Sequence, residues 1–348
     1  MKTELLAPTD AALDKAARLI REGELVAFPT ETVYGLGADA LSAPAVLKIF
    51  TAKGRPADNP LIVHVCSLAD SEPLCTPTEA ARLLAHAFWP GPMTLLMPKK
   101  PIVPLETNAG LASVAVRVPS HPVARALIAR SGCAIAAPSA NTSGRPSPTE
   151  AAHVLEDMNG KVPLILDGGP CAVGLESTVI DVTGEVPTVL RPGGVTPEMI
   201  EAVTGRVAVA DSVLRPLREG EKALSPGMRY RHYAPRGQLT LVTGEAEQVL
   251  SRMAALYDAA EREGRSPALL AFEEHLPTLG TRRVFSIGRL SQPETVAAHL
   301  FAVLRQLDEV GADVMYSEAL PPQGIGLAIM NRLSRAAAFH TLSAEDAP

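Results

Sequence analysis

The chain has 348 residues, of which 47% are hydrophobic and 20% are charged, and its formal net charge is −6. This composition is typical of a folded globular protein and excludes an intrinsically disordered one. The negative charge argues against binding to nucleic acid by bulk electrostatics, and the length suits two domains with separate cores.

Nothing in the sequence indicates export or membrane insertion. No stretch approaches the ~18 uninterrupted apolar residues of a membrane span, and residues 1–10 lack the apolar region of a signal peptide. The four cysteines show neither CxxC nor zinc-site spacing, so we expect buried or incidental thiols in a reducing compartment. A cytoplasmic enzyme without membrane contact is the expectation.

In chain order, the first 205 residues alternate short apolar runs with amphipathic segments. Thr9 and Ser42 are predicted helix N-caps, and 76–79 and 147–150 resemble capping boxes. Strands are predicted at 25–28, 61–65, 93–97, 112–118, 133–137, 164–167, 177–182 and 188–191, and helices at 10–22, 77–88 and 121–131.

The segment PTETVYGLG, residues 29–37, follows the first predicted strand. Pro29 ends that strand, and Gly35 and Gly37 permit a close backbone approach or a positive φ. The hydroxyl of Thr32 lies between these breaks, and Ser177 begins a later strand. Their positions make both residues candidates for holding a small polar ligand.

The next motif, KGRPADNPLIVHV at 53–65, gathers polar groups before and within a short strand. Lys53 and Arg55 suit a polyphosphate, because arginine grips phosphate through a planar fork and lysine as a point charge. The alternative is a solvated loop, which is the more common setting for an isolated KxR. His64 has an alternative as a satisfied core histidine, which is the more frequent case.

Arg117 lies on the mixed face of the alternating strand 112–118, which it shares with Ser113. An arginine on such a strand needs an anionic partner, which is either an acid of the protein or a carboxylate ligand. The later loop PSANTSGRPSPTE holds Ser139, Asn141 and Ser147, and its alternative is turn and cap chemistry.

Residues 206–236 fit no regular element well, with seven Lys or Arg against three acids, and they end in SPGMRYRHYAP. This chemistry is dense for a tether, so we expect 225–235 to act as a lid. Beyond it, strands at 239–242, 268–272, 284–287 and 314–317 alternate with helices at 245–263, 293–310 and 325–338. That rhythm predicts a small α/β domain with a largely parallel sheet.

Several common catalytic motifs are absent: the sequence has no GxxxxGK[ST] phosphate loop, no GxSxG elbow, no HExxH and no kinase motif set. Any ATP would therefore be bound by the side chains described above.

Seven ordered motifs resemble the two-domain threonylcarbamoyl-AMP synthases of the Sua5/YrdC/YwlC group: PTETVYGLG, KGRPADNPLIVH, ASVAVRVP, APSAN, LESTVID, VLRPG and SPGMRYRHYAP. The resemblance implies a YrdC-like domain at 1–205 with a twisted mixed sheet and helices. It further implies a basic, aromatic linker or lid at 206–236 and a smaller Rossmann-like Sua5 accessory domain at 237–348.

The resemblance also implies the activity and the residues that carry it. Such enzymes make L-threonylcarbamoyladenylate and pyrophosphate from L-threonine, bicarbonate or CO2, and ATP, with Mg2+ expected on the phosphates. The implied ATP contacts are Lys53, Arg55, Asn59, Ser113, Ser139, Asn141, Ser147 and Arg191. The implied L-threonine contacts are Thr32, His64, Arg117, Ala137 and Ser177. The implied linker residues are Tyr230, Arg231, His232 and Tyr233. No metal ligand and no general base is assigned.

The product is expected to pass to the machinery that forms threonylcarbamoyladenosine in tRNA, while direct tRNA contact is not supported by the net charge. Two alternative functions compete with this interpretation. One is a related module that only binds RNA. The other is a related carbamoyltransferase domain, although the zinc-finger-like cysteine spacing of those proteins is absent here.

Overall fold

The computed structural model describes residues 2–345 apart from 55, 57, 58, 214 and 216–232. The chain divides into two compact units, and each is considered by itself. The first comprises Met1–Ser143 and Ser147–Arg229, and the second comprises Gly144–Pro146 and Tyr230–Pro348.

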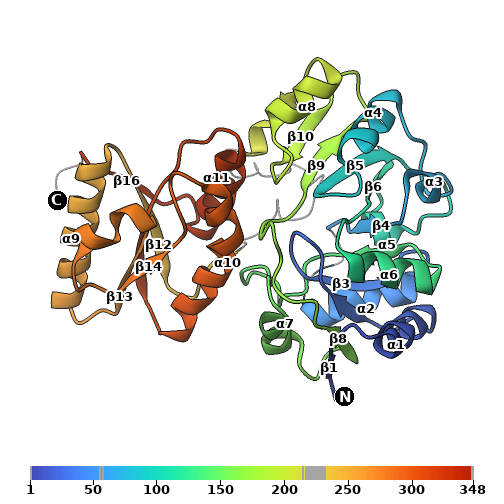
Figure 1. Cartoon of the computed structure of the whole chain (residues 1–348), viewed down its shortest axis with the longest axis horizontal. Helices are drawn as coiled ribbons and strands as arrows, with labels where there is room; N and C mark the ends of the chain where they lie inside the picture. Colours follow the sequence, from blue (N-terminus) through green and yellow to red (C-terminus); the bar gives the residue numbers. More distant parts are fainter. Residues whose placement is uncertain (1, 55, 57–58, 214, 216–232, 346–348) are drawn as a thin grey trace. The chain divides into compact units, whose positions relative to one another are not determined.

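The first unit is an α/β structure (Figure 1). Its strands are β1 (Glu4–Leu6), β2 (Val26–Phe28), β3 (Gly35–Asp39), β4 (Ile62–His64), β5 (Met93–Pro98), β6 (Ser113–Arg117), β7 (Ile135–Ala137), β8 (Leu164–Leu166), β9 (Thr178–Asp181), β10 (Thr188–Arg191) and β11 (Ala208–Val209). Its helices are α1 (Asp10–Arg21), α2 (Ala43–Lys53), α3 (Leu68–Ser71), α4 (Glu79–Phe88), α5 (Leu105–Asn108), α6 (Pro122–Ser131), α7 (Ala151–Met158) and α8 (Pro197–Thr204), followed by the 3-10 turn η1 (Asp211–Val213).

Within the described residues these strands form one sheet in the order β1-β8-β2-β3-β7-β4-β6-β5-β9-β10-β11. The sheet is mixed: β4 pairs with β6 in parallel and with β7 antiparallel, and β5 pairs with β6 antiparallel. The expected mixed sheet is confirmed.

The two faces of this sheet are covered differently. One face packs a large core that includes Val63, Val116 and Leu95. On the other face, a second core with α1 and α6 covers the β2, β7 and β8 region. Over β4, β5, β6 and β9 that second face carries a small apolar cluster of Ile62, Leu96, Ala115, Val179 and Leu190. Polar side chains of the same face border this cluster.

Two predicted caps are correct and two are not. Thr9 and Ser42 accept from the first turns of α1 and α2. The cap of α4 is Thr78 rather than Thr76, because the helix begins at Glu79. At α7 the N-cap residue Glu150 makes no side-chain cap. The hydroxyl of Ser147 donates to Glu176 instead, so Ser147 belongs to a polar cluster rather than to a helix end.

Gly37 illustrates why the opening motif needs glycine. A Cβ there would lie 2.7 Å from Cε1 of Phe28 and 2.8 Å from Cγ2 of Ile135, and such distances do not occur between real atoms. Of the two sequence-based alternatives, the reason at Gly37 is therefore close approach, since its φ is not positive.

The second unit is a five-stranded, fully parallel sheet over the described residues, in the order β14-β13-β15-β12-β16 (Figure 1). Its strands are β12 (Gln238–Thr243), β13 (Pro267–Ala271), β14 (Val284–Ser286), β15 (Val314–Glu318) and β16 (Thr341–Ser343). Its helices are α9 (Ala246–Arg262), η2 (Glu273–Leu279), α10 (Pro293–Glu309) and α11 (Ile325–Ala336). The expected Rossmann-like fold is confirmed, although β16 was not predicted.

Candidate active site

A row of side chains crosses the sheet beside the small apolar cluster. Strand register sets His64 of β4 opposite Arg117 of β6, and Arg117 opposite Thr94 of β5. Because paired residues project from the same face, these three polar side chains are neighbours across three strands. In the next row of the same face lie Ala137 and Ile62, which are also paired.

Arg117 is the centre of this row, and its side chain is 4% exposed. Its Nη1 donates to Oγ1 of Thr32 at 2.9 Å, and its Nε donates to the carbonyl of Gly91 at 3.3 Å. Its Nη2 lies 2.7 Å from Oε1 of Glu31. This last approach is not aligned as a hydrogen bond, so the contact is an ion pair held chiefly by charge.

Glu31 is the protein acid that Arg117 requires, and the sequence did not single it out. Its carboxylate is 10% exposed and also accepts the backbone N–H of Ser120 at 3.2 Å. Burial by itself would raise the pKa of Glu31, but the positive charge of Arg117 and the backbone hydrogen bonds to the carboxylate outweigh burial and hold that pKa below its ordinary value. The lowered pKa favours the charged carboxylate form of Glu31. Its only signal in the sequence is its place inside PTETVYGLG.

The hydroxyl of Thr32 has a fixed orientation. Thr30 gives its single proton to the carbonyl of Val33 at 2.7 Å, so the 2.8 Å contact between the two threonine hydroxyls has Thr32 as donor. Thr32 also accepts from Arg117. Any further hydrogen bond to the oxygen of Thr32 must come from a donor.

His64 is a neutral imidazole. Burial, followed by the nearby positive charge of Arg117, lowers the pKa of His64 to about 3. Its Nδ1 lies 3.1 Å from the carbonyl of Ile62 and 3.3 Å from that of Ile135, so Nδ1 carries the proton. Nε2 is consequently a hydrogen-bond acceptor.

A second series of hydrogen-bonded polar groups extends the row through β5 and β9. Thr94 and Ser177 share a hydrogen bond of 2.8 Å between their hydroxyls. Arg191 donates to the carbonyl of Ser177 from Nε at 3.1 Å and from Nη2 at 3.0 Å. Contacts therefore link Arg191 and Ser177 to Thr94, which was not predicted and which stands opposite Arg117.

Lys53 meets the serine-rich loop. Its Nζ donates to the carbonyls of Ser139 at 2.6 Å and Asn141 at 2.5 Å. Ser139 in turn donates to Oδ1 of Asn141, and it forms a β-bridge with Gly35 of the opening motif. The 53–65 motif, the serine-rich loop and the 29–37 motif are widely separated in sequence, and these contacts bring all three together.

Comparisons with known proteins identify the family to which this chain belongs. A Sua5/YciO/YrdC family model described as "Telomere recombination" matches residues 18–193, and a model of the C-terminal domain of threonylcarbamoyl-AMP synthase matches 195–338. The threonylcarbamoyl-AMP synthase of Bacillus subtilis is 48% identical, with 96% of this chain and 95% of that protein aligned. The chain belongs to the threonylcarbamoyl-AMP synthase family.

Other members of the threonylcarbamoyl-AMP synthase family agree along the whole chain. The Pyrococcus abyssi synthase is 46% identical, with 94% of each chain covered. A crystal structure of P. abyssi Sua5 complexed with L-threonine has a TM-score of 0.91 and 44% identity, and covers 98% of each chain. The resemblance expected from the motifs and the enzyme class are confirmed.

Three further residues expected at the synthase site lie in the first unit. Ser113 begins β6, at the opposite end of the strand from Arg117. Asn59 is buried shortly before β4, and Ser147 meets Glu176, next to Ser177. Arg55, Tyr230, Arg231 and His232 lie outside the described residues.

Tyr233 is described, and it packs within the second unit. Its ring is 5.1 Å from that of Phe301 between centroids, and the guanidinium of Arg332 lies 5.9 Å from the Tyr233 centroid. The side chain is buried, at 4% exposure.

Among the described residues of the chain, no helix is long and apolar enough to cross a membrane.

Proposed function

We propose that this chain synthesises L-threonylcarbamoyladenylate from L-threonine, bicarbonate or CO2, and ATP, and releases pyrophosphate. The observation that carries the proposal is the buried Arg117–Glu31 pair with Thr32 attached, in a member of this family. The pair is a site with one positive and one negative charge, which matches a zwitterionic amino acid.

L-threonine would bind with its carboxylate on Arg117 and its amino group toward Glu31. Each terminal nitrogen of Arg117 carries a second hydrogen that the described contacts do not use, and these two hydrogens suit a carboxylate. Thr32 and Nε2 of His64 accept hydrogen bonds, which suits the ammonium and hydroxyl donors of threonine. Ala137 and Ser177 would border the same ligand.

ATP would bind on the side of Lys53 and the 139–147 loop. Lys53 brings a positive charge to Ser139 and Asn141, which suits a triphosphate. Ser147 and Arg191 continue this side through Glu176 and Ser177. Arg55, Asn59 and Ser113 complete the proposed set, and the residues from Tyr230 to Tyr233 are proposed to act as a lid over the nucleotide.

Mg2+ is proposed to arrive on the phosphates of ATP. In the described part of the chain, no three His, Cys, Asp or Glu side chains are grouped so that they could hold a metal ion. When bound, it would neutralise phosphate charge.

In this reaction the main role of the protein is to position the substrates. The amine of threonine attacks bicarbonate or CO2 to give a carbamate, with water lost when bicarbonate is the source. A carbamate oxygen then attacks the α-phosphorus, the bond to the β-phosphate bridging oxygen breaks, and pyrophosphate leaves. Arg117 would fix the threonine carboxylate, and Lys53 would offset phosphate charge, so that both substrates are held in reacting orientation.

The product is proposed to serve the threonylcarbamoyl-transfer machinery that modifies tRNA. The net charge of −6 gives no support to direct binding of tRNA by the whole molecule. A cytoplasmic location remains a prediction.

The test is pyrophosphate formation from ATP, with threonine and bicarbonate omitted in turn. We expect turnover to require both, and Arg55→Ala to abolish it. Turnover that survives either omission would contradict the proposal. Salt-sensitive tRNA binding without turnover would favour the RNA-binding rival, and activity with carbamoyl phosphate in place of threonine and bicarbonate would favour the carbamoyltransferase rival.

A further inference from the structure

The second unit contains a pocket of about 360 Å3 that the chemistry above does not use. It lies at the carboxyl ends of three neighbouring parallel strands and is lined by residues from β12, β15, the segment after β13, and the start of α9. Its volume falls near the lower end of the ~300–1000 Å3 that is usual for small-molecule sites.

The topology explains why a pocket forms there. β12 and β15 are paired neighbours, yet α9, which follows β12, lies on one side of the sheet, and α11, which follows β15, lies on the other (Figure 1). The connections leave the two strand ends in opposite directions and open a crevice between them. In open α/β sheets this switch point is where ligands bind.

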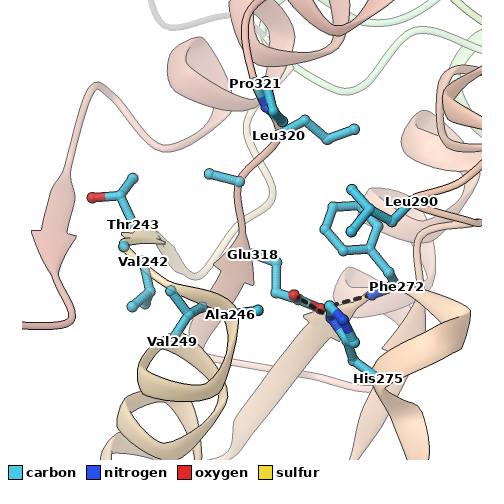
Figure 2. A pocket seen from close by; sticks show the side chains of 12 residues that line it. Val242, Thr243, Ala246, Val249, Phe272, His275, Leu290, Glu318, Leu320 and Pro321 are labelled. Atoms are coloured by element: carbon cyan, nitrogen blue, oxygen red, sulfur yellow. Dashed lines mark hydrogen bonds and ion pairs between the residues drawn. The ribbon is translucent and has the colours of Figure 1, made fainter.

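The floor of the pocket is a pair of polar groups, the buried Glu318 and the partly buried His275 (Figure 2). The Glu318 carboxylate is 4% exposed, accepts the N–H of Phe272 at 2.8 Å and lies 2.6 Å from Nδ1 of His275. In the tautomer whose Nδ1 donates to Glu318, Nε2 is an acceptor. Nε2 has no partner among the described residues. The floor therefore offers acceptors to a ligand that carries N–H donors.

The walls are apolar. Figure 2 shows Phe272 and Leu290 together on one side, with Val242, Val249 and Ala246 on the other. Such walls suit a flat, largely apolar ring. Among the described residues that line the pocket, none is Lys or Arg. A phosphate or free carboxylate would therefore find no permanently charged cation in this lining.

The start of α9 adds donors at one side of the pocket. Its N-cap residue, Glu245, makes no side-chain cap, and the first intrahelical bond is donated by Val249. The N–H groups of the first turn, beginning at Ala246, can therefore donate to hydroxyl oxygens of a ligand. The exposed carboxylates of Glu245 and Glu247 disfavour an anion at this helix end.

We propose that this pocket binds an uncharged purine nucleoside, with the N–H edge of its base on Glu318 and His275, its ring between Phe272 and Val249, and its sugar at the start of α9. The proposal concerns the second unit alone and does not rest on the function proposed for the first unit.

The test is calorimetric titration of adenosine and guanosine into the full chain at saturating ATP, which occupies the site proposed in the first unit. Ala246→Trp places a large side chain in the pocket from an exposed helix position, and Gln248→Trp adds the same side chain to the same turn outside it. We expect one nucleoside per chain in the unmodified protein and in Gln248→Trp, and at least a tenfold loss of affinity in Ala246→Trp.

Three results would overturn the proposal: no nucleoside binding at saturating ATP, equal affinity in both tryptophan variants, or Ala246→Trp-sensitive binding of tyramine without nucleoside binding. The last result would make the pocket a site for a cationic amine. Leu290→Lys, at a half-exposed wall position, repeats the test if Ala246→Trp fails to fold, and a tenfold loss is expected there too. Pyrophosphate formation, measured in parallel, should be unchanged in every variant.

Discussion

In each unit a buried carboxylate lies beside a basic nitrogen, and these two carboxylates behave in opposite ways. In the first unit Glu31 lies 2.7 Å from Arg117, and its pKa is lowered. In the second unit Glu318 lies 2.6 Å from His275, and its pKa is raised. Burial raises the pKa of both groups, so the partner decides the direction.

The difference lies in the permanence of the partner's charge. A guanidinium stays protonated at every physiological pH, whereas an imidazole can lose its proton. Arg117 therefore outweighs the burial of Glu31, while burial of Glu318 outweighs the hydrogen bonds from Phe272 and His275. The ligand proposed for the first pair accordingly carries fixed charges, and the ligand proposed for the second does not.

The largest expected effect comes from removing the permanent cation. Arg117→Met leaves Glu31 buried without its partner, and losses of this kind are about 3–5 kcal/mol in unfolding free energy. Threonine-dependent pyrophosphate formation should also be lost. Urea unfolding and the pyrophosphate assay measure the two effects separately.

The matched control is the double variant Glu31→Gln/Arg117→Met. It removes both charges, so it should regain most of the stability and none of the activity. If the single variant unfolds at the same urea concentration as the parent, or if the double variant is no more stable than the single one, the ion pair does not have the role described here.

Sequence patterns predicted the fold well because most of its signals are local. Alternation placed Arg117 on the mixed face of β6, and Thr9 and Ser42 were correct as caps. Short elements with weak patterns failed: β16 has three residues, and the cap of α4 moved by two positions to Thr78.

The site was less predictable, because its contacts depend on strand order. Arg117 and Thr32 are 85 residues apart in sequence, and they meet only because β3, β7, β4 and β6 are successive in the sheet. Nothing local distinguishes Glu31 from a surface acid, or Thr94 from a core threonine. Both become functional candidates only when Arg117 is placed beside them.

A smaller effect should appear in the pH dependence of stability, through His64. Its folded pKa of about 3 lies below the ordinary 6.5, so the unfolded chain takes up this proton first as the pH falls. The contribution of His64 is complete above the unfolded pKa and is lost as the pH falls toward the folded one. By pH 5 this loss should be about 2 kcal/mol.

Urea unfolding at pH 7 and pH 5 checks this prediction in the parent protein and in His64→Asn. Asparagine retains a donor for the carbonyl of Ile62 but does not titrate, so the parent should lose about 2 kcal/mol more than the variant between these pH values. Equal losses in the two proteins would mean that His64 is not held neutral by burial.

The smallest effect should come from Glu318→Gln, and it separates the two carboxylates most directly. Because the folded pKa of Glu318 is raised, its contribution to stability is present below the ordinary pKa of 4.5 and is lost as the pH rises through the folded value. A neutral amide avoids that loss and can still accept the N–H of Phe272, so stability at pH 7 should stay within about 1 kcal/mol of the parent. Glu31→Gln, measured beside it, leaves the guanidinium of Arg117 buried without its counter-charge and should be clearly less stable. Equal unfolding free energies for the two glutamine variants would mean that Arg117 and His275 stabilise a buried carboxylate to the same extent. The distinction between the two sites would then be wrong.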